Sequence, residues 1–441
     1  MKHLNLLRSG SVWALASRIV LALCALAVNA ALGRLLGPES IGQYFLFVQL
    51  VVFGAIFFSV GLPSSILKLN GIAVEKGDWK SVWQLVRRVL VILSVSSMLG
   101  YGLLLLNWDR LSAIIFNECV GSDLMLLAYV SIVFRLLQNF SSVFFRSVHQ
   151  PRTGVLLLHL PREVGLAIAF FVLFLLWDRV TIDVVISTYV GILAVAVTLC
   201  VYLVIKFKKN QNSIGGTQGM IGYMSLIALT APMYVGNIAG EIARTSDLWI
   251  LGALGEEIDV GLYGAAMRLT LMLAMMLDVI NLIIPPMIAA LYEKKDLAQL
   301  EKVVRSSATW SMCLVVPVAL VLLIFADEIL KLVFGPGFEQ GATVLRILVL
   351  GHGLGVVIGS PAVILQMTGH QKTMMKLTLM SVLVGVCSQL AVVSTYGIVG
   401  VAIVSAGIII CQKSIMVYLV KRRTGVWTLP YARLSKAFVR T

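Results

Sequence analysis

The stretch LGRLLGPESIGQY at residues 32–44 recurs as LGALGEEIDVGLY at residues 251–263. Leucine, glycine, leucine, isoleucine or valine, glycine and tyrosine fall in register, each 219 positions after its counterpart. Both copies lie between long apolar stretches, so each predicts a tight turn between two membrane helices. The question is why one chain carries the same turn twice, about half its length apart.

Two further motifs recur in the same order. The segment GIAVEKGDWKSVWQLVRR at 71–88 resembles the region around YEKKDLAQLEKVVRS at 292–306, at an offset of 218. The dipeptide His-Gln at 149–150 is echoed at 370–371, at an offset of 221. Short glycine-rich turns can look alike by convergence, but three ordered motifs at nearly one offset favour an internal duplication.

The composition places this duplicated chain in a membrane. Of its 441 residues, 59% are hydrophobic and 13% are charged, with a mean hydropathy of +0.96. A soluble domain needs about a quarter of its residues charged. Twelve apolar stretches, each of about 20 residues or more, are long enough to cross the bilayer as helices.

The predicted fold is therefore an all-α integral membrane protein with about twelve transmembrane helices. Because each repeat holds an even number of spans, we expect two parallel six-helix bundles, related by a pseudo-two-fold axis along the membrane normal, with a central cavity. The expected parts are an N-terminal bundle (1–209), a cytoplasmic linker (210–220), a C-terminal bundle (221–420) and a basic cytoplasmic tail (421–441).

The distribution of Lys and Arg predicts the orientation. With both termini cytoplasmic, the cytoplasmic segments hold 24 of the 35 basic residues and the outer segments hold 5. Cytoplasmic loops carry such an excess, so both termini are predicted to lie inside. The short loops leave no room for a soluble catalytic domain, and neither a nucleotide-binding P-loop nor metal-ligand spacing of Cys and His occurs. We expect no enzyme, no catalytic residues and no metal.

Charged residues inside the spans are the candidate functional residues. Each costs ~2.5–3.5 kcal/mol or more at membrane depth, so such residues usually face a protein-lined cavity. In the seventh span, four polar residues follow at helical spacing and share one face. An inward surplus of Arg suits an anionic ligand, because guanidinium groups bind phosphate and carboxylate in a bidentate manner. The substrate-binding candidates are Arg18, Arg135, Arg162, Asn237, Arg244 and Arg268, and the ion-coupling candidates are Glu241, Asp247 and Asp278.

Two simpler interpretations stay open for these charges. Arg244 could only neutralise Glu241 or Asp247, and Arg162 could only pair with Glu163. Arg18 lies about two turns from the inner surface, so its side chain could extend to the interface instead.

The two turns, the VGLPSSILKLNG that follows the first, and STYGIVGVAIVSA at 394–406 resemble the Wzx-like polysaccharide flippases of the multidrug/oligosaccharidyl-lipid/polysaccharide exporter superfamily. The resemblance implies two bundles around a central cavity. It also implies transport of a polyprenyl-pyrophosphate-linked oligosaccharide, such as an O-antigen unit, across the bacterial inner membrane.

Further expectations follow from this resemblance. Membrane lipid and other polysaccharide-assembly membrane proteins are the expected partners, and nucleic acid is not. No cofactor is expected, whereas coupling to a proton or sodium gradient is an open expectation. The alternative function is a proton- or sodium-coupled multidrug or small-molecule exporter of the same superfamily, which would use the carboxylates.

Overall fold

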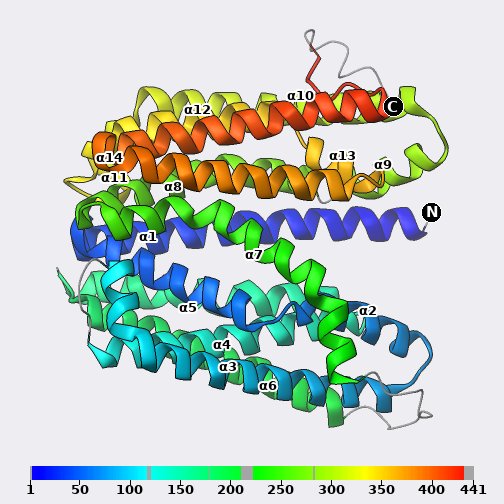
Figure 1. Ribbon diagram of the computed structural model, residues 1–441, viewed down its shortest axis with the longest axis horizontal. Coiled ribbons are helices and arrows are strands. Elements are labelled where there is room, and N and C mark those ends of the chain that lie inside the picture. The colour runs from blue at the N-terminus through cyan, green and yellow to red at the C-terminus, as the bar shows by residue number, and fades with distance from the viewer. Residues whose placement is uncertain (1, 117–120, 178, 210–221, 282–283, 432–441) are drawn as a thin grey trace. The chain divides into compact units, whose positions relative to one another are not determined.

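The computed structural model describes residues 2–116, 121–177, 179–209, 222–281 and 284–431 (Figure 1). These residues form helices joined by turns, and no strand occurs among them. The helices up to the predicted linker are α1 (Lys2–Phe58), α2 (Leu62–Glu75), α3 (Trp79–Phe116), α4 (Ser122–Ser147), α5 (Pro151–Leu176) and α6 (Ile182–Lys209). Those after it are α7 (Tyr223–Leu254), α8 (Glu257–Ile280), α9 (Ile284–Glu293), α10 (Leu297–Ile324), α11 (Ala326–Phe334), the 3₁₀ turn η1 (Phe338–Gly341), α12 (Ala342–Val357), α13 (Pro361–Met367) and α14 (Gln371–Thr424).

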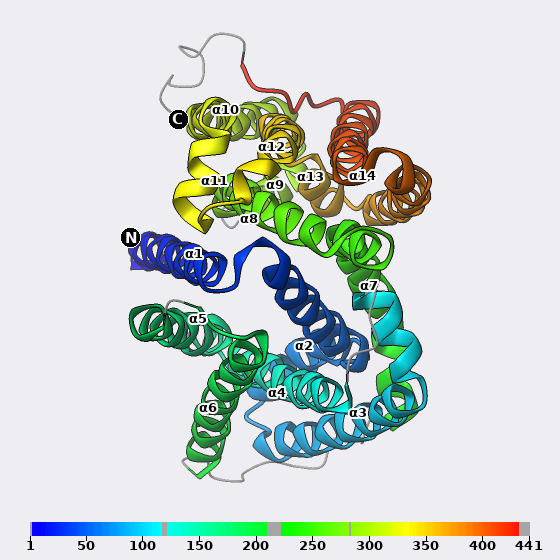
Figure 2. The same ribbon diagram turned by 90° about the vertical axis from the view of Figure 1, so that its left-hand side faces the viewer.

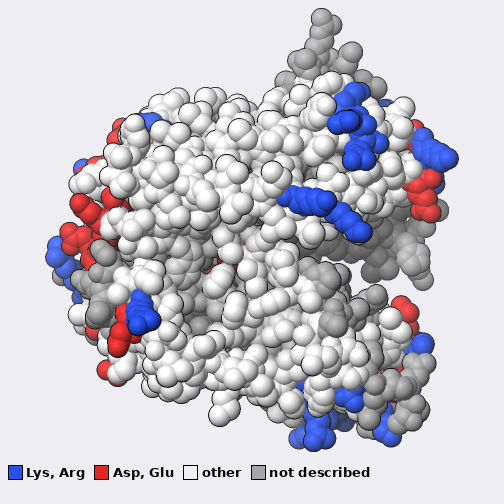
Figure 3. Space-filling view, in the orientation of Figure 1, with Lys and Arg blue, Asp and Glu red and all other residues white. Residues whose placement is uncertain are grey.

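The lengths and hydropathy of the helices fit membrane crossing. Nine helices in the described part of the chain are long and apolar enough to span a bilayer. Two of these, α1 and α14, each contain a non-helical glycine, Gly37 (φ 75°) and Gly397 (φ 53°), which divides them into two helical segments. Charged side chains gather near the helix ends on the face drawn in Figure 3, and uncharged residues cover most of the middle. The number of twelve crossings stays a prediction.

The chain divides into two compact units, and the predicted division into bundles at 1–209 and 221–420 stays a prediction. Unit 1 comprises Met1–Gly42 and Ser246–Thr441, and unit 2 comprises Gln43–Thr245. Helices α1 and α7 therefore each contribute residues to both units. The predicted linker at 210–220 lies outside the described residues.

One central helix organises each unit. In unit 1, α12 packs on α8, α10 and α14 (Figure 2), and in unit 2, α4 packs on α2, α3, α5 and α6. The two central helices come after α3 and α10, which hold the third predicted span of each sequence repeat. Corresponding helices thus occupy corresponding places within their own units.

The end of the first α1 segment belongs to unit 1 because it packs closely on α11. A Cβ added to Gly33 would lie 2.7 Å from the carbonyl oxygen of Phe334, so only glycine allows this approach. Arg34 donates a hydrogen bond from Nη2 to the carbonyl oxygen of Leu332 at 2.6 Å. Leu32 is fully buried beside these contacts.

Within unit 1 the two copies of the repeated turn pack against each other. A Cβ on Gly42 would lie 2.8 Å from the carbonyl oxygen of Glu257, and a Cβ on Gly261 would overlap the carbonyl oxygen of Pro38. Each glycine thus contacts the turn that precedes the other, which is the reciprocal pattern of a two-fold relation. The equivalent residues Ile41 and Val260 are both buried.

The second repeated motif forms the same turn in each half. Gly77 donates its N–H to the carbonyl oxygen of Val74 at 3.0 Å, and Lys295 donates to that of Tyr292 at 3.0 Å. Both turn residues have positive φ, 69° for Gly77 and 58° for Lys295. Residues that are related by the sequence offset of 218 therefore also share a backbone conformation.

The aspartate that follows this turn caps the next helix in both halves. Asp78 accepts hydrogen bonds from the N–H and hydroxyl of Ser81 at 3.1 and 2.6 Å. Asp296 accepts one from the N–H of Gln299 at 3.0 Å. The bonds from Ser81 lower the pKa of Asp78. The shared acidic segment is thus explained by helix capping.

The third motif aligns one residue differently from the sequence match. Gln150 donates its N–H to the carbonyl oxygen of Phe145 at 2.9 Å, and His370 donates to that of Leu365 at 2.8 Å. Position 150 therefore corresponds to position 370, an offset of 220. The predicted offset of 221 matched the residue letters, whereas the backbone turn sets the structural register.

The cap at Asp296 gives a test of this local structure. Asp296→Ala leaves the N–H of Gln299 without its acceptor, and we expect the free energy of unfolding to fall by about 1 kcal/mol. Denaturant titration of the protein in detergent measures the change. Asp296→Asn keeps a side-chain acceptor and is expected to match the wild type. Equal stability of the Ala and Asn variants would contradict the capping role.

Candidate functional site

The sequence-predicted site residues fall on five helices. Asn237, Glu241, Arg244 and Asp247 lie on α7, and the others lie on α1, α4, α5 and α8. The side chains of Arg18 and Asp278 are outside the described part of the structure.

Arg244 is an exposed cation beside a buried acid. Its guanidinium donates a hydrogen bond to the carboxylate of Glu241, one helical turn earlier. The Arg244 side chain is 72% exposed, whereas that of Glu241 is only 6% exposed. Asn237, two turns from Arg244, is also exposed. The pairing that the sequence left open is present, yet most of the guanidinium surface is accessible.

The depth of Arg244 along α7 limits what its exposed side can face. It lies ten residues before the last residue of the helix, Leu254. At 1.5 Å per residue, this places it about 15 Å from that end. In the predicted seventh span, a guanidinium this far from the helix end is too costly to leave in hydrocarbon. The exposed surface therefore suits a water-filled or ligand-filled space.

Arg135 is held by hydrogen bonds to uncharged groups in unit 2. Its Nη1 donates to Oε1 of Gln138 at 3.0 Å, and Nε2 of that fully buried amide donates to the carbonyl oxygen of Leu157 at 3.1 Å. An amide orients the guanidinium without cancelling its charge. The arrangement on the central helix α4 can therefore attract an anion.

Arg162 and Arg268 differ from these two. Arg162 on α5 pairs with Glu163, and the two side chains are only 12% and 18% exposed. Its charge is thus neutralised within unit 2. Arg268 on α8 is partly buried. Arg135 and Arg244 are the predicted arginines whose described contacts fit an anion site best.

Asp247 lies in a buried cluster of neutral polar groups in unit 1. It is 5% exposed, and its Oδ2 accepts a hydrogen bond from the hydroxyl of Tyr263 at 2.7 Å. Its Oδ1 accepts the N–H of Leu248 at 3.0 Å. None of the ion pairs between described residues includes Asp247. The carboxylate is thus solvated by hydrogen-bond donors and not by a cation.

Side chains of α14 extend this cluster. The Tyr263 hydroxyl contacts Oγ of Ser405 at 3.2 Å, and Nε2 of Gln389 donates to the same oxygen at 3.0 Å. Ser246 in turn donates to Oε1 of Gln389 at 3.1 Å. The sequence interpretation missed these partners, because it treated Tyr263 only as a turn residue. The recurrence of tyrosine at positions 44 and 263 is the one signal that pointed to its place.

No group of three or more His, Cys, Asp or Glu residues suited to a metal ion occurs in the part of the chain searched. The Asp247 cluster holds one carboxylate and several neutral oxygens. Such a set can take up a proton or a weakly held monovalent cation.

Comparison with known proteins agrees with this architecture. The profile described as polysaccharide biosynthesis protein matches residues 7–292. A second profile, MatE, matches residues 232–391. The first match covers more than half of the chain.

Two named relatives come from different organisms. A probable low-salt glycan biosynthesis flippase of Haloferax volcanii is 30% identical over 175 residues, which are 39% of this chain and 36% of that protein. The chain thus matches about a third of the Haloferax relative. A putative O-antigen transporter of Shigella flexneri is 21% identical over 425 residues, 95% of this chain and 98% of that protein.

Solved structures share the fold. A multidrug resistance transporter of the MATE family in an inward-facing conformation superposes with a TM-score of 0.74 at 16% identity, over 92% of this chain and 94% of that chain. The lipid II flippase MurJ, inward closed, gives 0.61 at 12% identity, over 87% of both chains. These likenesses concern the fold, and they confirm the predicted class of all-α integral membrane protein.

Proposed function

Because this chain belongs to the polysaccharide biosynthesis protein family, we propose that it is a flippase for an anionic, polyprenyl-pyrophosphate-linked oligosaccharide. The predicted resemblance to Wzx-like flippases is confirmed by the family match and the named relatives. Those relatives are transporters, so the chain is a multi-pass membrane transporter and not an enzyme. The proposed direction is from the cytoplasmic to the outer leaflet of the bacterial inner membrane.

The observation that carries the proposal is the exposed guanidinium of Arg244, about 15 Å from the end of α7. A glycan headgroup cannot cross hydrocarbon unaided, since each unsatisfied polar group costs several kcal/mol. A planar guanidinium can bind two phosphate oxygens at once. Arg244 and Arg135 supply the positive charge that a pyrophosphate needs along the path. The guanidinium of Arg135 is oriented by the amide of Gln138.

The proposed mechanism is alternating access. The headgroup enters from the cytoplasmic side and exchanges its hydration for contacts with these arginines, while the polyprenyl tail stays in lipid. Closure on the inner side then opens the path to the outer side. The carboxylate of Glu241 accepts a hydrogen bond from Arg244 and so keeps the guanidinium in position while the protein changes from the inward-open to the outward-open state.

Asp247 is the proposed coupling residue. A bare carboxylate out of water costs several kcal/mol, and the hydrogen bonds from Tyr263 and Leu248 offset part of that cost. Uptake of a proton or sodium ion offsets the rest. Because Ser405 and Gln389 connect the site to both segments of α14, a change of charge at Asp247 can alter how α7, α8 and α14 pack.

The second candidate function is a coupled exporter of small amphipathic compounds. The MatE profile over residues 232–391 favours it, and so does the buried Glu241, because carboxylates bind cationic drugs. A drug-efflux assay distinguishes the two functions. Efflux that depends on Glu241 but not on Arg135 would support the exporter.

Removal of either arginine tests the flippase proposal. In a strain that lacks the gene, Arg244→Ala and Arg135→Ala are each expected to lower surface polysaccharide about tenfold or more, since a charged hydrogen bond contributes about 1.5–3 kcal/mol. The lipid-linked intermediate should accumulate on the cytoplasmic face. Radiolabelled glycan extracted from the lipid fraction measures this.

Two control variants sharpen the test. Arg110→Ala removes an exposed arginine near the end of α3 and should leave the rate unchanged. Arg244→Lys keeps the charge without the planar fork, so an intermediate rate is expected. Normal rates in both alanine variants would refute the cationic path.

A further inference from the structure

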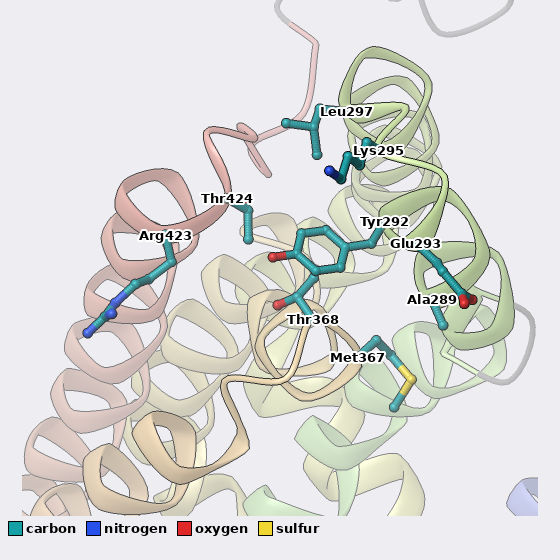
Figure 4. Close-up of a pocket in the computed structure, with 9 residues that line it drawn as sticks. All are labelled: Ala289, Tyr292, Glu293, Lys295, Leu297, Met367, Thr368, Arg423 and Thr424. Carbon is teal, nitrogen blue, oxygen red and sulfur yellow. The ribbon is translucent and has the colours of Figure 1, made fainter.

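A pocket lies at one end of unit 1, where α9, the start of α10, the end of α13 and the end of α14 meet (Figure 4). Its volume is about 670 Å³. The polar residues that line it are Tyr292, Glu293, Lys295, Thr368, Arg423 and Thr424. The three chain segments involved are all predicted to be cytoplasmic, so the pocket is expected at the inner membrane surface.

Two donors of this pocket have no protein partner among the described residues, whereas the hydroxyls of Thr368 and Thr424 already donate to backbone carbonyls. Figure 4 shows the Lys295 ammonium and the Tyr292 hydroxyl directed into the pocket, with the Thr368 hydroxyl close to that of Tyr292. No hydrogen bond or ion pair among the described residues engages Lys295 Nζ or the Tyr292 hydroxyl. The guanidinium of Arg423 and the carboxylate of Glu293 both point away from the centre. Positive charge and free donors together fit an anion rich in oxygen.

The other half of the duplication has the same turns without these groups. By the backbone hydrogen bonds, Tyr292 corresponds to Val74 and Lys295 to Gly77. Thr368 corresponds in the same way to Val148, since each donates its N–H to the residue four positions earlier. The turn and its capped helix therefore form without Tyr292 or Lys295, so the fold does not explain them.

Lys295 also adopts a backbone conformation that disfavours a side chain. Its φ is 58°, in the left-handed region where the first half has glycine. Strain of this kind persists where the surroundings impose it, and it often marks a functional position. Here it directs an ammonium group into the pocket.

The walls of the pocket are fixed in place. Beyond α14, the N–H of Trp427 donates to Oε2 of Glu301 at 3.1 Å, and Nε of Arg305 donates to the carbonyl oxygen of Leu429 at 3.1 Å. The guanidinium of Arg305 also stacks on Tyr431, 4.3 Å from the ring centre. These contacts hold the end of α14 against α10. The pocket is thus a formed site and not a gap between mobile ends.

We propose that this pocket binds a phosphate group at the cytoplasmic membrane surface, with the Lys295 ammonium and the Tyr292 hydroxyl as its donors. The phosphate could belong to an anionic lipid headgroup or to a soluble phosphate. Met367 and Leu297 supply apolar surface beside the donors, which suits a lipid. This site is separate from the arginines of the transport path, and it does not depend on the proposed substrate.

Titration of the purified full-length protein in detergent tests the proposal. The probes are dihexanoyl phosphatidic acid, dihexanoyl phosphatidylcholine and inorganic phosphate, each followed by calorimetry. We expect phosphatidic acid to bind, and Lys295→Gly to weaken it about tenfold, the loss of one charge-assisted contact. Tyr292→Phe should weaken it less. Lys294→Gly, an equal charge change next to the pocket, is the control and should have no effect.

The possible outcomes distinguish a lipid ligand from a soluble phosphate, and they also show whether the proposal is wrong. Because position 77 already holds glycine, Lys295→Gly should keep or raise the thermal stability while it lowers binding, a pair of effects that a purely structural lysine would not give. Binding of inorganic phosphate that competes and depends on Lys295 would support the site with a soluble ligand. Unchanged binding in Lys295→Gly, or an equal loss in Lys294→Gly, would overturn the proposal.

Discussion

Gly261→Ala is expected to prevent unit 1 from assembling. A Cβ at this position would overlap the carbonyl oxygen of Pro38. The carbonyl oxygen is part of the backbone and the Cβ is bonded directly to it, each near the start of a helical segment, so neither atom can rotate away. Overpacking of a core costs about 1–3 kcal/mol even where side chains can shift, and a larger loss is expected here. Fluorescence-detected size exclusion of the solubilised protein should show loss of the monodisperse peak.

A glycine without close neighbours provides the matched control. Gly407 lies within α14, and a Cβ there would meet nothing within 4 Å. Gly407→Ala should leave the protein intact or stabilise it by about 0.5–1 kcal/mol, because alanine favours the helix. If Gly261→Ala eluted like Gly407→Ala, the close contact of the two repeated turns would be wrong.

Asp247→Asn is expected to abolish coupling while it preserves the fold. The amide oxygen can still accept the hydrogen bond that Tyr263 donates, whereas the amide nitrogen cannot accept the N–H of Leu248, so the cluster keeps its main side-chain contact at a cost of about 1 kcal/mol. The variant has no charge to balance, however, so neither a proton nor a sodium ion gains by binding. We expect the response of transport to an imposed proton or sodium gradient to fall about tenfold or more, as for loss of a charged hydrogen bond. Proteoliposomes with defined gradients measure this.

Tyr263→Phe separates charge from hydrogen bonding at the same place. It keeps the carboxylate but removes its closest side-chain donor, so stability should fall by about 1–3 kcal/mol while gradient dependence persists. Wild-type gradient dependence in Asp247→Asn would exclude this carboxylate as the coupling group.

The local structure of the repeats was largely readable from the sequence. Gly42 and Gly261 occupy matching positions in the two copies of the repeated turn. Asp78 and Asp296 each lie at the N-cap position, directly before a helix. Turns and caps depend on a few neighbouring residues, so a repeated pattern predicts a repeated conformation. The His-Gln match was off by one residue because the turn at 145–150 is set by backbone bonds.

The long-range partners were not readable. Helical spacing placed Glu241 and Arg244 on one face of α7, but it could not show that one is buried and the other exposed. The partners of Asp247 lie as far away as Ser405 on α14, and nothing local to either residue encodes that proximity. The division into units was equally hidden, because it depends on the approach of Gly33 to Phe334.

The packing of residues 32–42 in unit 1 must wait for a part of the chain that is synthesised much later. Arg34 binds the carbonyl of Leu332, a partner 298 positions later in the chain. A ribosome adding 5–20 residues per second reaches that partner roughly 15–60 seconds after Arg34 is made. During that interval the first helix sits in the bilayer without its final neighbours. This α1 segment is thus made long before the partner on which it packs, and a chain truncated before α11 would lack the Leu332 carbonyl that Arg34 contacts.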